Sequence, residues 1–186
     1  MTTASMTTWY GDIPVPLFNS FATIKLLICD IDGVFSDGRI YLGNDGEELK
    51  AFNTRDGFGI KAALNAGIEV AAITGRQSNI VERRMTALGV THIYQGQQDK
   101  TLVYEELIAQ LQLQDHEVAY VGDDVPDLAL IRRVGLGIAV RDAHASVLQA
   151  AQYVTTLSGG FGAVREVTDL LLMAQGQLNQ YTGTSE

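Results

Sequence analysis

Short, uninterrupted apolar runs recur along the chain, and they most strongly constrain how it can fold. The run at residues 26–29 ends at acidic residues and a glycine, as expected for a strand buried on both faces of a sheet. Comparable runs lie at residues 70–73, 92–94, 118–121, 136–140 and 153–155. The sequence therefore contains several candidate strands of the kind found in parallel sheets.

The segments between these runs have apolar residues at helical spacing, as at Ile60, Ala63 and Leu64. Similar spacing occurs near residues 80–88, 102–111 and 128–134, and we expect a closing helix at about 163–175. Strands that alternate with helices form parallel sheets with right-handed crossovers and helices on both faces. The predicted fold is α/β, a Rossmann-like three-layer α/β/α sandwich with a mainly parallel sheet.

Residues 38–52 depart from this alternation. Aromatic and aliphatic residues flank Asn44-Asp45-Gly46, which is a strong signal for a hairpin turn. We therefore expect a β-hairpin inserted after the first strand, where it could form part of a site wall or a contact between subunits.

The length of 186 residues suits a single domain with one core. We place this domain at residues 21–176, with the hairpin at about 38–52 as an insertion. Residues 1–20 and 177–186 are expected to be a flexible N-terminal segment and a flexible C-terminal tail.

Composition excludes several classes of partner. The net charge of −9 opposes binding to nucleic acid or to anionic membrane surfaces. No apolar run approaches the roughly 20 residues that span a bilayer, and the N-terminus lacks the features of a signal peptide. The single cysteine, Cys29, excludes an internal disulfide framework. These observations predict a cytoplasmic protein that binds neither nucleic acid nor membranes.

Two acidic clusters follow candidate strands. Asp30 and Asp32 end the first strand, and side chains two apart on an extended chain point the same way. Asp123, Asp124 and Asp127 follow the run at 118–121. Ligands of open parallel sheets bind beyond the carboxyl ends of the strands, and adjacent carboxylates require a cation or a shared proton. We expect the clusters to converge on Mg²⁺, which prefers oxygen ligands.

A hydroxyl and an ammonium join these carboxylates. Thr74 follows the second long run, and Lys100 opens a later helix. A nucleophilic carboxylate, a metal and donors to the phosphoryl oxygens are what phosphoryl transfer requires.

The set Asp30-Ile31-Asp32-Gly33, Thr74-Gly75, Lys100 and Gly122-Asp123-Asp124-Val125-Pro126-Asp127 resembles, in that order, the four motifs of the haloacid dehalogenase superfamily of phosphatases. The resemblance implies that Asp30 attacks phosphorus and forms an aspartyl phosphate. Asp32 would protonate the leaving oxygen and then activate water. Thr74 and Lys100 would hold and neutralise the phosphoryl group.

The same resemblance implies a magnesium site. Its ligands would be Asp30, the backbone carbonyl of Asp32, and Asp123. Asp124 and Asp127 would orient waters or Lys100 instead of binding the metal directly.

Longer segments at residues 30–38, 46–57, 73–76 and 159–167 resemble the family of 3-deoxy-D-manno-octulosonate 8-phosphate phosphatases, which act in lipopolysaccharide biosynthesis. This implies a phosphoric monoester hydrolase whose substrate is a small sugar-acid phosphate. The implied substrate-binding residues are Asp32, Asn53, Thr54, Arg55, Asp56, Gly57, Lys61, Arg76, Arg84 and Lys100. Several cations suit a substrate with both a phosphate and a carboxylate. Thr54 and Lys61 depart from the family, where valine and arginine are familiar, and Lys61 cannot make the bidentate contact of an arginine.

The chain has no cap domain of the kind that closes many sites in the superfamily. The family is tetrameric, so the resemblance implies a homotetramer in which neighbouring subunits complete the site through the hairpin and residues 159–162.

The sequence is also compatible with other substrates and functions. A nine-carbon sialic-type sugar-acid phosphate is the alternative substrate. A sugar phosphomutase would share the nucleophile, but it must shield the aspartyl phosphate from water. A receiver-type signalling domain also combines aspartates, a threonine and a lysine, but its acids after the first strand are adjacent, whereas Asp30 and Asp32 alternate.

Overall fold

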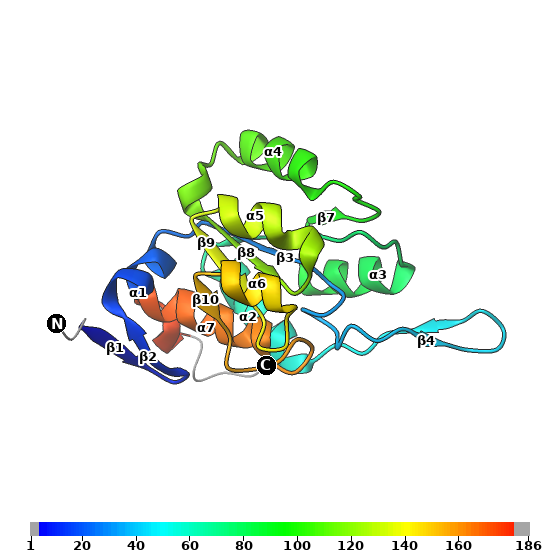
Figure 1. Ribbon diagram of the computed structural model, residues 1–186, viewed down its shortest axis with the longest axis horizontal. Helices are drawn as coiled ribbons and strands as arrows, with labels where there is room; N and C mark the ends of the chain where they lie inside the picture. The colour runs from blue at the N-terminus through cyan, green and yellow to red at the C-terminus, as the bar shows by residue number, and fades with distance from the viewer. Residues whose placement is uncertain (1–3, 181–186) are drawn as a thin grey trace.

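A six-stranded sheet forms the centre of the protein in the computed structural model, which describes residues 4–180 (Figure 1). The strands are β3 (Leu26–Cys29), β6 (Glu69–Ile73), β7 (His92–Tyr94), β8 (Val118–Gly122), β9 (Leu136–Ala139) and β10 (Tyr153–Val154). Their order is β10-β9-β8-β3-β6-β7, and every neighbouring pair is parallel. The predicted parallel sheet is confirmed.

Helices cover both faces of this sheet, as predicted for a three-layer sandwich. The helices that follow β3 are α2 (Thr54–Asn65), α3 (Asn79–Leu88), α4 (Lys100–Leu111), α5 (Leu128–Arg133), α6 (Ala145–Ala150) and α7 (Ala163–Ala174). α2 packs against α7 on one face, and α4 and α5 lie on the other (Figure 1). No helix within residues 4–180 is long and apolar enough to cross a membrane.

The register of the sheet brings the predicted site together. Cys29, the last residue of β3, pairs with Ala72 on β6 and with Val121 on β8. The three neighbouring strands therefore end at the same edge. The residues that follow them, among them Asp30, Thr74 and Asp123, emerge side by side.

The predicted hairpin is present. Strands β4 (Tyr41–Leu42) and β5 (Glu48–Leu49) pair antiparallel around a turn that contains Gly46 at φ +78°. The hairpin extends away from the body of the molecule (Figure 1). Among the described residues, no cap domain accompanies it.

The predicted flexibility of residues 1–20 is wrong for residues 5–20. This part of the chain forms β1 (Ser5–Thr8), β2 (Gly11–Pro14) and most of α1 (Val15–Ala22). Burial explains the difference, because Ile13 and Phe18 lie in the core and the Tyr10 hydroxyl donates a hydrogen bond to Asp169 at 2.7 Å. Residues 1–3 lie outside the described part of the chain.

The predicted flexible tail, residues 177–186, is also partly wrong. Residues Leu178–Gln180 form a 3-10 turn, η3, and Leu178 is buried against Ala62 and Leu172. That apolar contact attaches the segment to α2 and α7. Residues 181–186 lie outside the described part of the chain.

Candidate active site

A cavity of about 430 Å³ opens at the carboxyl edge of the sheet. It brings together most of the residues that the motifs predicted for the chemistry. Those that line it are Asp30, Asp32, Thr74, Arg76, Lys100, Asp123, Asp124 and Asp127. The convergence of the four motifs, which the sequence could only imply, is thus a property of the fold.

Asp30 follows β3 and is buried at the base of the cavity. Its Oδ1 lies 3.0 Å from the Lys100 ammonium. Burial raises the pKa of Asp30 to about 6, although the charge of Lys100 acts in the opposite direction. The carboxylate form of Asp30 therefore depends on positive charge close to it.

Lys100 begins α4, whose N-terminus is capped by the side chain of Asp99. Its ammonium donates hydrogen bonds to Asp127 Oδ1 at 2.7 Å and to the Tyr120 hydroxyl at 3.2 Å. Burial lowers the pKa of Lys100, but the carboxylates of Asp30 and Asp127 outweigh burial, so the net shift is upward. Lys100 thus supplies a fixed positive charge beside Asp30.

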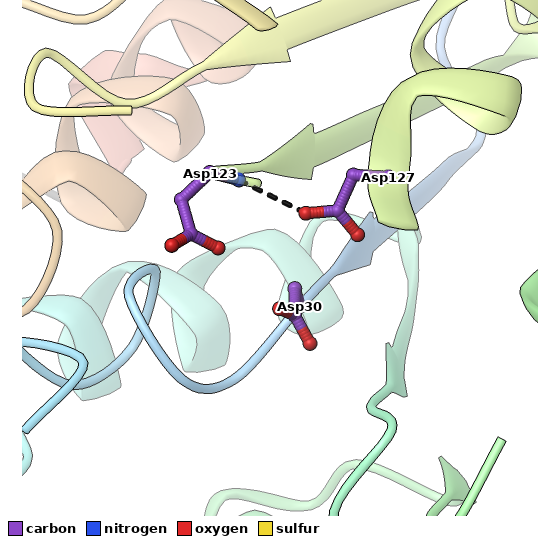
Figure 2. A group of neighbouring side chains, drawn as sticks. All are labelled: Asp30, Asp123 and Asp127. Carbon is purple, nitrogen blue, oxygen red and sulfur yellow. Dashed lines mark hydrogen bonds between the residues drawn. The ribbon is translucent and has the colours of Figure 1, made fainter. Parts of the chain in front are cut away.

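Asp127 lies at the end of the short helix η2 (Val125–Asp127) and uses both of its oxygens within the protein. Oδ1 accepts from Lys100 and from the Tyr120 hydroxyl, each at 2.7 Å. Oδ2 accepts from the backbone N–H groups of Asp123, at 3.0 Å, and Asp124, at 3.3 Å. Figure 2 shows the Asp123 bond and the grouping of Asp127 with Asp30 and Asp123. These bonds shape the loop after β8 and hold Lys100 in place.

The residues fit a divalent cation. Carboxylate oxygens of Asp30, Asp123 and Asp127 lie within 4.8 Å of one another, and Asp123 Oδ1 is buried without a hydrogen-bond partner among the described residues. Burial raises the pKa of Asp123 to about 8, and the nearby Asp30 adds to this effect. Carboxylates this close need a positive charge between them, and the set of oxygens suits a hard cation such as Mg²⁺.

Asp32 and Thr74 both line the cavity, and each contacts Arg76. The Asp32 carboxylate contacts Lys50 through Oδ1 and lies 3.8 Å from Arg76 Nε through Oδ2. Thr74 follows β6, is buried, and its hydroxyl accepts a hydrogen bond from the Arg76 N–H at 3.4 Å. Asp32 therefore has partners different from those of Asp30.

Several predicted substrate-binding residues are not among those lining the cavity: Asn53, Thr54, Arg55, Asp56, Gly57, Lys61 and Arg84. Asn53 caps α2 by accepting from the Arg55 N–H, and buried Asp56 accepts from the Arg165 N–H. Thr54 is exposed in the first turn of α2. Within one chain, these contacts are structural.

The remaining members of this group lie along α2 and α3. A Cβ on Gly57 would lie 2.4 Å from Arg84 Nη2, so the glycine makes room for that guanidinium, which also lies over the ring of Phe52. Lys61 is exposed on a different surface, beside Leu64 and Thr86. A single subunit does not bring Lys61 or Arg84 to the cavity.

The motifs did not identify four residues near the site: Gln97, Gln98, Glu48 and Lys50. Gln97 and Gln98 line the cavity, and Lys50 and Glu48 contact the residues that do. Glu48 and Lys50 are two apart at a strand end, so their side chains could have been assigned to one face from the sequence. Nothing in the sequence showed that this face turns toward Asp32.

Comparisons with known proteins agree with this geometry. Residues 86–165 match the family model described as haloacid dehalogenase-like hydrolase. The 3-deoxy-D-manno-octulosonate 8-phosphate phosphatase of Yersinia pestis is 54% identical over 183 residues, 98% of each chain.

Solved structures of 3-deoxy-D-manno-octulosonate 8-phosphate phosphatases are also similar to this chain. A crystal structure of the Yersinia pestis phosphatase has a TM-score of 0.96 and 53% identity, covering 100% of both chains. The phosphatase of Moraxella catarrhalis, solved in complex with magnesium ion, phosphate ion and a KDO molecule, has a TM-score of 0.87 and 42% identity over 89% of this chain and 95% of its own.

Proposed function

Because this chain belongs to the 3-deoxy-D-manno-octulosonate 8-phosphate phosphatases of the haloacid dehalogenase-like hydrolases, we propose that it releases phosphate from that sugar-acid ester with Asp30 as nucleophile. The products are the free sugar acid, used in lipopolysaccharide biosynthesis, and inorganic phosphate. One observation carries the assignment of Asp30: its carboxylate lies 3.0 Å from Lys100 at the base of the cavity.

In the proposed reaction, an Asp30 oxygen attacks phosphorus and the bond to the sugar oxygen breaks. Asp32 gives its proton to that oxygen, which leaves as an alcohol. Asp32 then accepts a proton from water, whose oxygen attacks the aspartyl phosphate. Phosphate is released and the Asp30 carboxylate is restored, so that both aspartates return to their starting states.

Thr74 and Lys100 hold the phosphoryl group in this proposal. The Thr74 hydroxyl, after the end of β6, and the Lys100 ammonium, at the start of α4, both line the cavity, so they can reach different phosphoryl oxygens. Lys100 also keeps a positive charge beside Asp30, which favours its nucleophilic form. Asp127 and Tyr120 fix the lysine.

Magnesium is the cofactor, and we propose that Asp30, Asp123 and the backbone carbonyl of Asp32 hold it. The free, buried Oδ1 of Asp123 supports this choice, whereas the oxygens of Asp127 are occupied by protein donors. When bound, the ion neutralises the carboxylates and polarises the phosphoryl oxygens. Asp124 and Asp127 shape the loop and do not bind the metal in this proposal.

We also propose a homotetramer in which a neighbouring subunit completes the site. The hairpin supports this, because Ile40, Tyr41, Leu42 and Leu49 leave large apolar side chains exposed on it. It also offers a role for the residues outside the cavity. Lys61, Arg84 and the segment 53–57 would contact substrate in a neighbour's site.

A cytoplasmic location is our proposal as well. Cys29 is a buried free thiol next to the nucleophile, which is compatible with a reducing compartment.

The test is phosphate release by the purified protein from 3-deoxy-D-manno-octulosonate 8-phosphate and from a nine-carbon sugar-acid phosphate. We expect activity on the octulosonate ester with magnesium, and its loss with EDTA or in Asp30→Asn. Asp12→Asn, an exposed change of the same kind on β2, should keep full activity. Activity retained by Asp30→Asn would contradict the covalent mechanism. A preference for the nine-carbon ester would contradict the proposed substrate.

A further inference from the structure

Four charged side chains form a closed ring at one wall of the cavity: Asp32, Glu48, Lys50 and Arg76. Lys50 Nζ contacts Asp32 Oδ1 and lies 3.7 Å from Glu48 Oε1. Arg76 Nη2 donates to Glu48 Oε2 at 3.4 Å, and its Nε lies 3.8 Å from Asp32 Oδ2. Each carboxylate thus faces both cations, and the ring carries no net charge when Asp32 is deprotonated.

The members of the ring differ in burial. The Lys50 side chain is 2% exposed, whereas that of Arg76 is 44% exposed. An ion pair in water contributes little to stability, so the contacts of Arg76 can be exchanged easily. A buried ammonium that loses its partners is strongly destabilising, because its charge is left unpaired away from water. Lys50 is therefore the fixed member of the ring.

The base of the hairpin places this lysine. Glu48 lies on β5 and Lys50 follows it, so their side chains point to the same side of the extended chain. Leu49 between them points away and is exposed. The hairpin thus turns a charged pair toward the site and an apolar residue toward its surroundings.

We propose that Lys50 is a positioning residue for Asp32. It binds Oδ1 and thereby leaves Oδ2, on the side of Arg76, for proton transfer to the leaving oxygen and from water. Glu48 fixes Lys50 and Arg76 in turn. This role rests on the proposed acid-base function of Asp32, and it makes the hairpin part of the catalytic arrangement within one subunit.

The test compares Lys50→Met with the unchanged enzyme on the octulosonate ester and on para-nitrophenyl phosphate, which has no carboxylate. Misplacing a catalytic group by about 1 Å can cost on the order of 10²-fold in rate. We expect kcat to fall by on the order of 10²-fold for both substrates, with KM for the aryl phosphate unchanged. Lys25→Met is the control. Lys25 is an exposed lysine that pairs with Glu117 and precedes β3, at the end of the strand opposite to Asp30. The kcat of this variant should equal that of the unchanged enzyme.

Two results would overturn the proposal. One is an unchanged kcat on both substrates in Lys50→Met. The other is a higher KM for the octulosonate ester alone, which would make Lys50 a substrate contact. If Lys50→Met does not fold, Glu48→Gln tests the same proposal, because this substitution keeps the shape of the side chain and removes its charge. We expect Glu48→Gln to have a lower kcat on both substrates. An unchanged kcat would overturn the proposal.

Asp32→Asn separates this inference from the proposed function. An active Asp32→Asn would defeat the acid-base mechanism itself. An inactive Asp32→Asn beside a fully active Lys50→Met would defeat only the role of Lys50.

Discussion

Gly33 lies between the two acidic clusters and has a conformation that other residues rarely adopt. Its φ is +96°, and a Cβ would lie 2.0 Å from Asp123 Oδ2. The residue therefore permits both the turn after Asp32 and the approach of Asp123 to Asp30.

We expect Gly33→Ala to abolish phosphatase activity, because the added methyl group displaces the Asp123 carboxylate. The backbone strain should also lower the free energy of unfolding by about 1–3 kcal/mol. Gly67→Ala is the matched control: φ is +85° there, but a Cβ meets nothing within 4 Å. It should lose stability and keep activity. Equal activity of the two variants, measured by phosphate release, would contradict the prediction.

Asp56 illustrates a carboxyl group that opposes folding. Burial raises its pKa to about 6, although the Arg165 N–H donates to Oδ1 at 2.8 Å and acts in the opposite direction. The folded protein therefore holds this proton more tightly than the unfolded chain, in which aspartate titrates near about 3.9. The contribution of Asp56 to stability must fall as pH rises from about 4 to about 6, by up to about 3 kcal/mol, and then stay constant.

Asp56→Asn removes this titration. The free energy of unfolding can be measured with urea for Asp56→Asn and for the protein that keeps Asp56. The value for the variant minus the value for the protein with Asp56 should be higher at pH 7 than at pH 4. A difference between the two proteins that does not depend on pH would show that burial of Asp56 has no such effect.

At the level of elements, Glu166 joins helix α7 to the segment that follows β10. It is fully buried and accepts hydrogen bonds from the Tyr153 hydroxyl, from the Thr156 hydroxyl and N–H, and from the Leu157 N–H, at 2.6–3.1 Å. The same segment leads to Gly159, where a Cβ would lie 1.7 Å from the Gly33 carbonyl oxygen. Glu166 thus supports the loop that packs against the loop of the proposed nucleophile, Asp30.

We expect Glu166→Gln to lower the free energy of unfolding by about 1–3 kcal/mol, because the new NH₂ group faces N–H donors that lose their acceptor. Tyr153→Phe removes a single bond to Glu166 and should cost about 1 kcal/mol. Chemical denaturation of both variants provides the measurement. If Glu166→Gln is as stable as Tyr153→Phe or more stable, the proposed role of Glu166 in supporting the loop is contradicted.

At the level of the whole molecule, the hairpin carries exposed apolar side chains that a single chain leaves unexplained. Leu42, which ends β4, is 71% exposed, and the hairpin extends from the body (Figure 1). Burying such side chains against neighbouring subunits would stabilise the proposed tetramer.

Leu42→Glu should therefore dissociate the assembly and reduce activity on the octulosonate ester, since a charge cannot be buried there without a partner. Light scattering gives the mass in solution. Leu102→Glu changes an exposed leucine of α4 and should leave both mass and activity unaltered. If the protein without either substitution is monomeric in solution and fully active, the proposed tetramer is ruled out.

Local sequence determined the sheet, most helices and the acidic motifs at the strand ends. Continuous apolar runs need burial on both faces, and acidic residues after such runs must emerge at the carboxyl edge, so Asp30 and Asp123 could be placed without a structure. The end segments were misjudged because their order comes from a few long-range contacts, such as Phe18 and Leu178 with the core, which leave no periodic pattern.

Tertiary structure alone decided which charges meet. Asp127 and Asp123 belong to one motif, yet hydrogen bonds occupy Asp127 and leave an Asp123 oxygen free for a cation. Lys50 contacts Asp32 because the hairpin turns one face inward. Sequence supplies the chemical groups and the strand ends that carry them. Ion pairing acts over a few ångströms between segments far apart in the chain, so only the folded structure determines its partners.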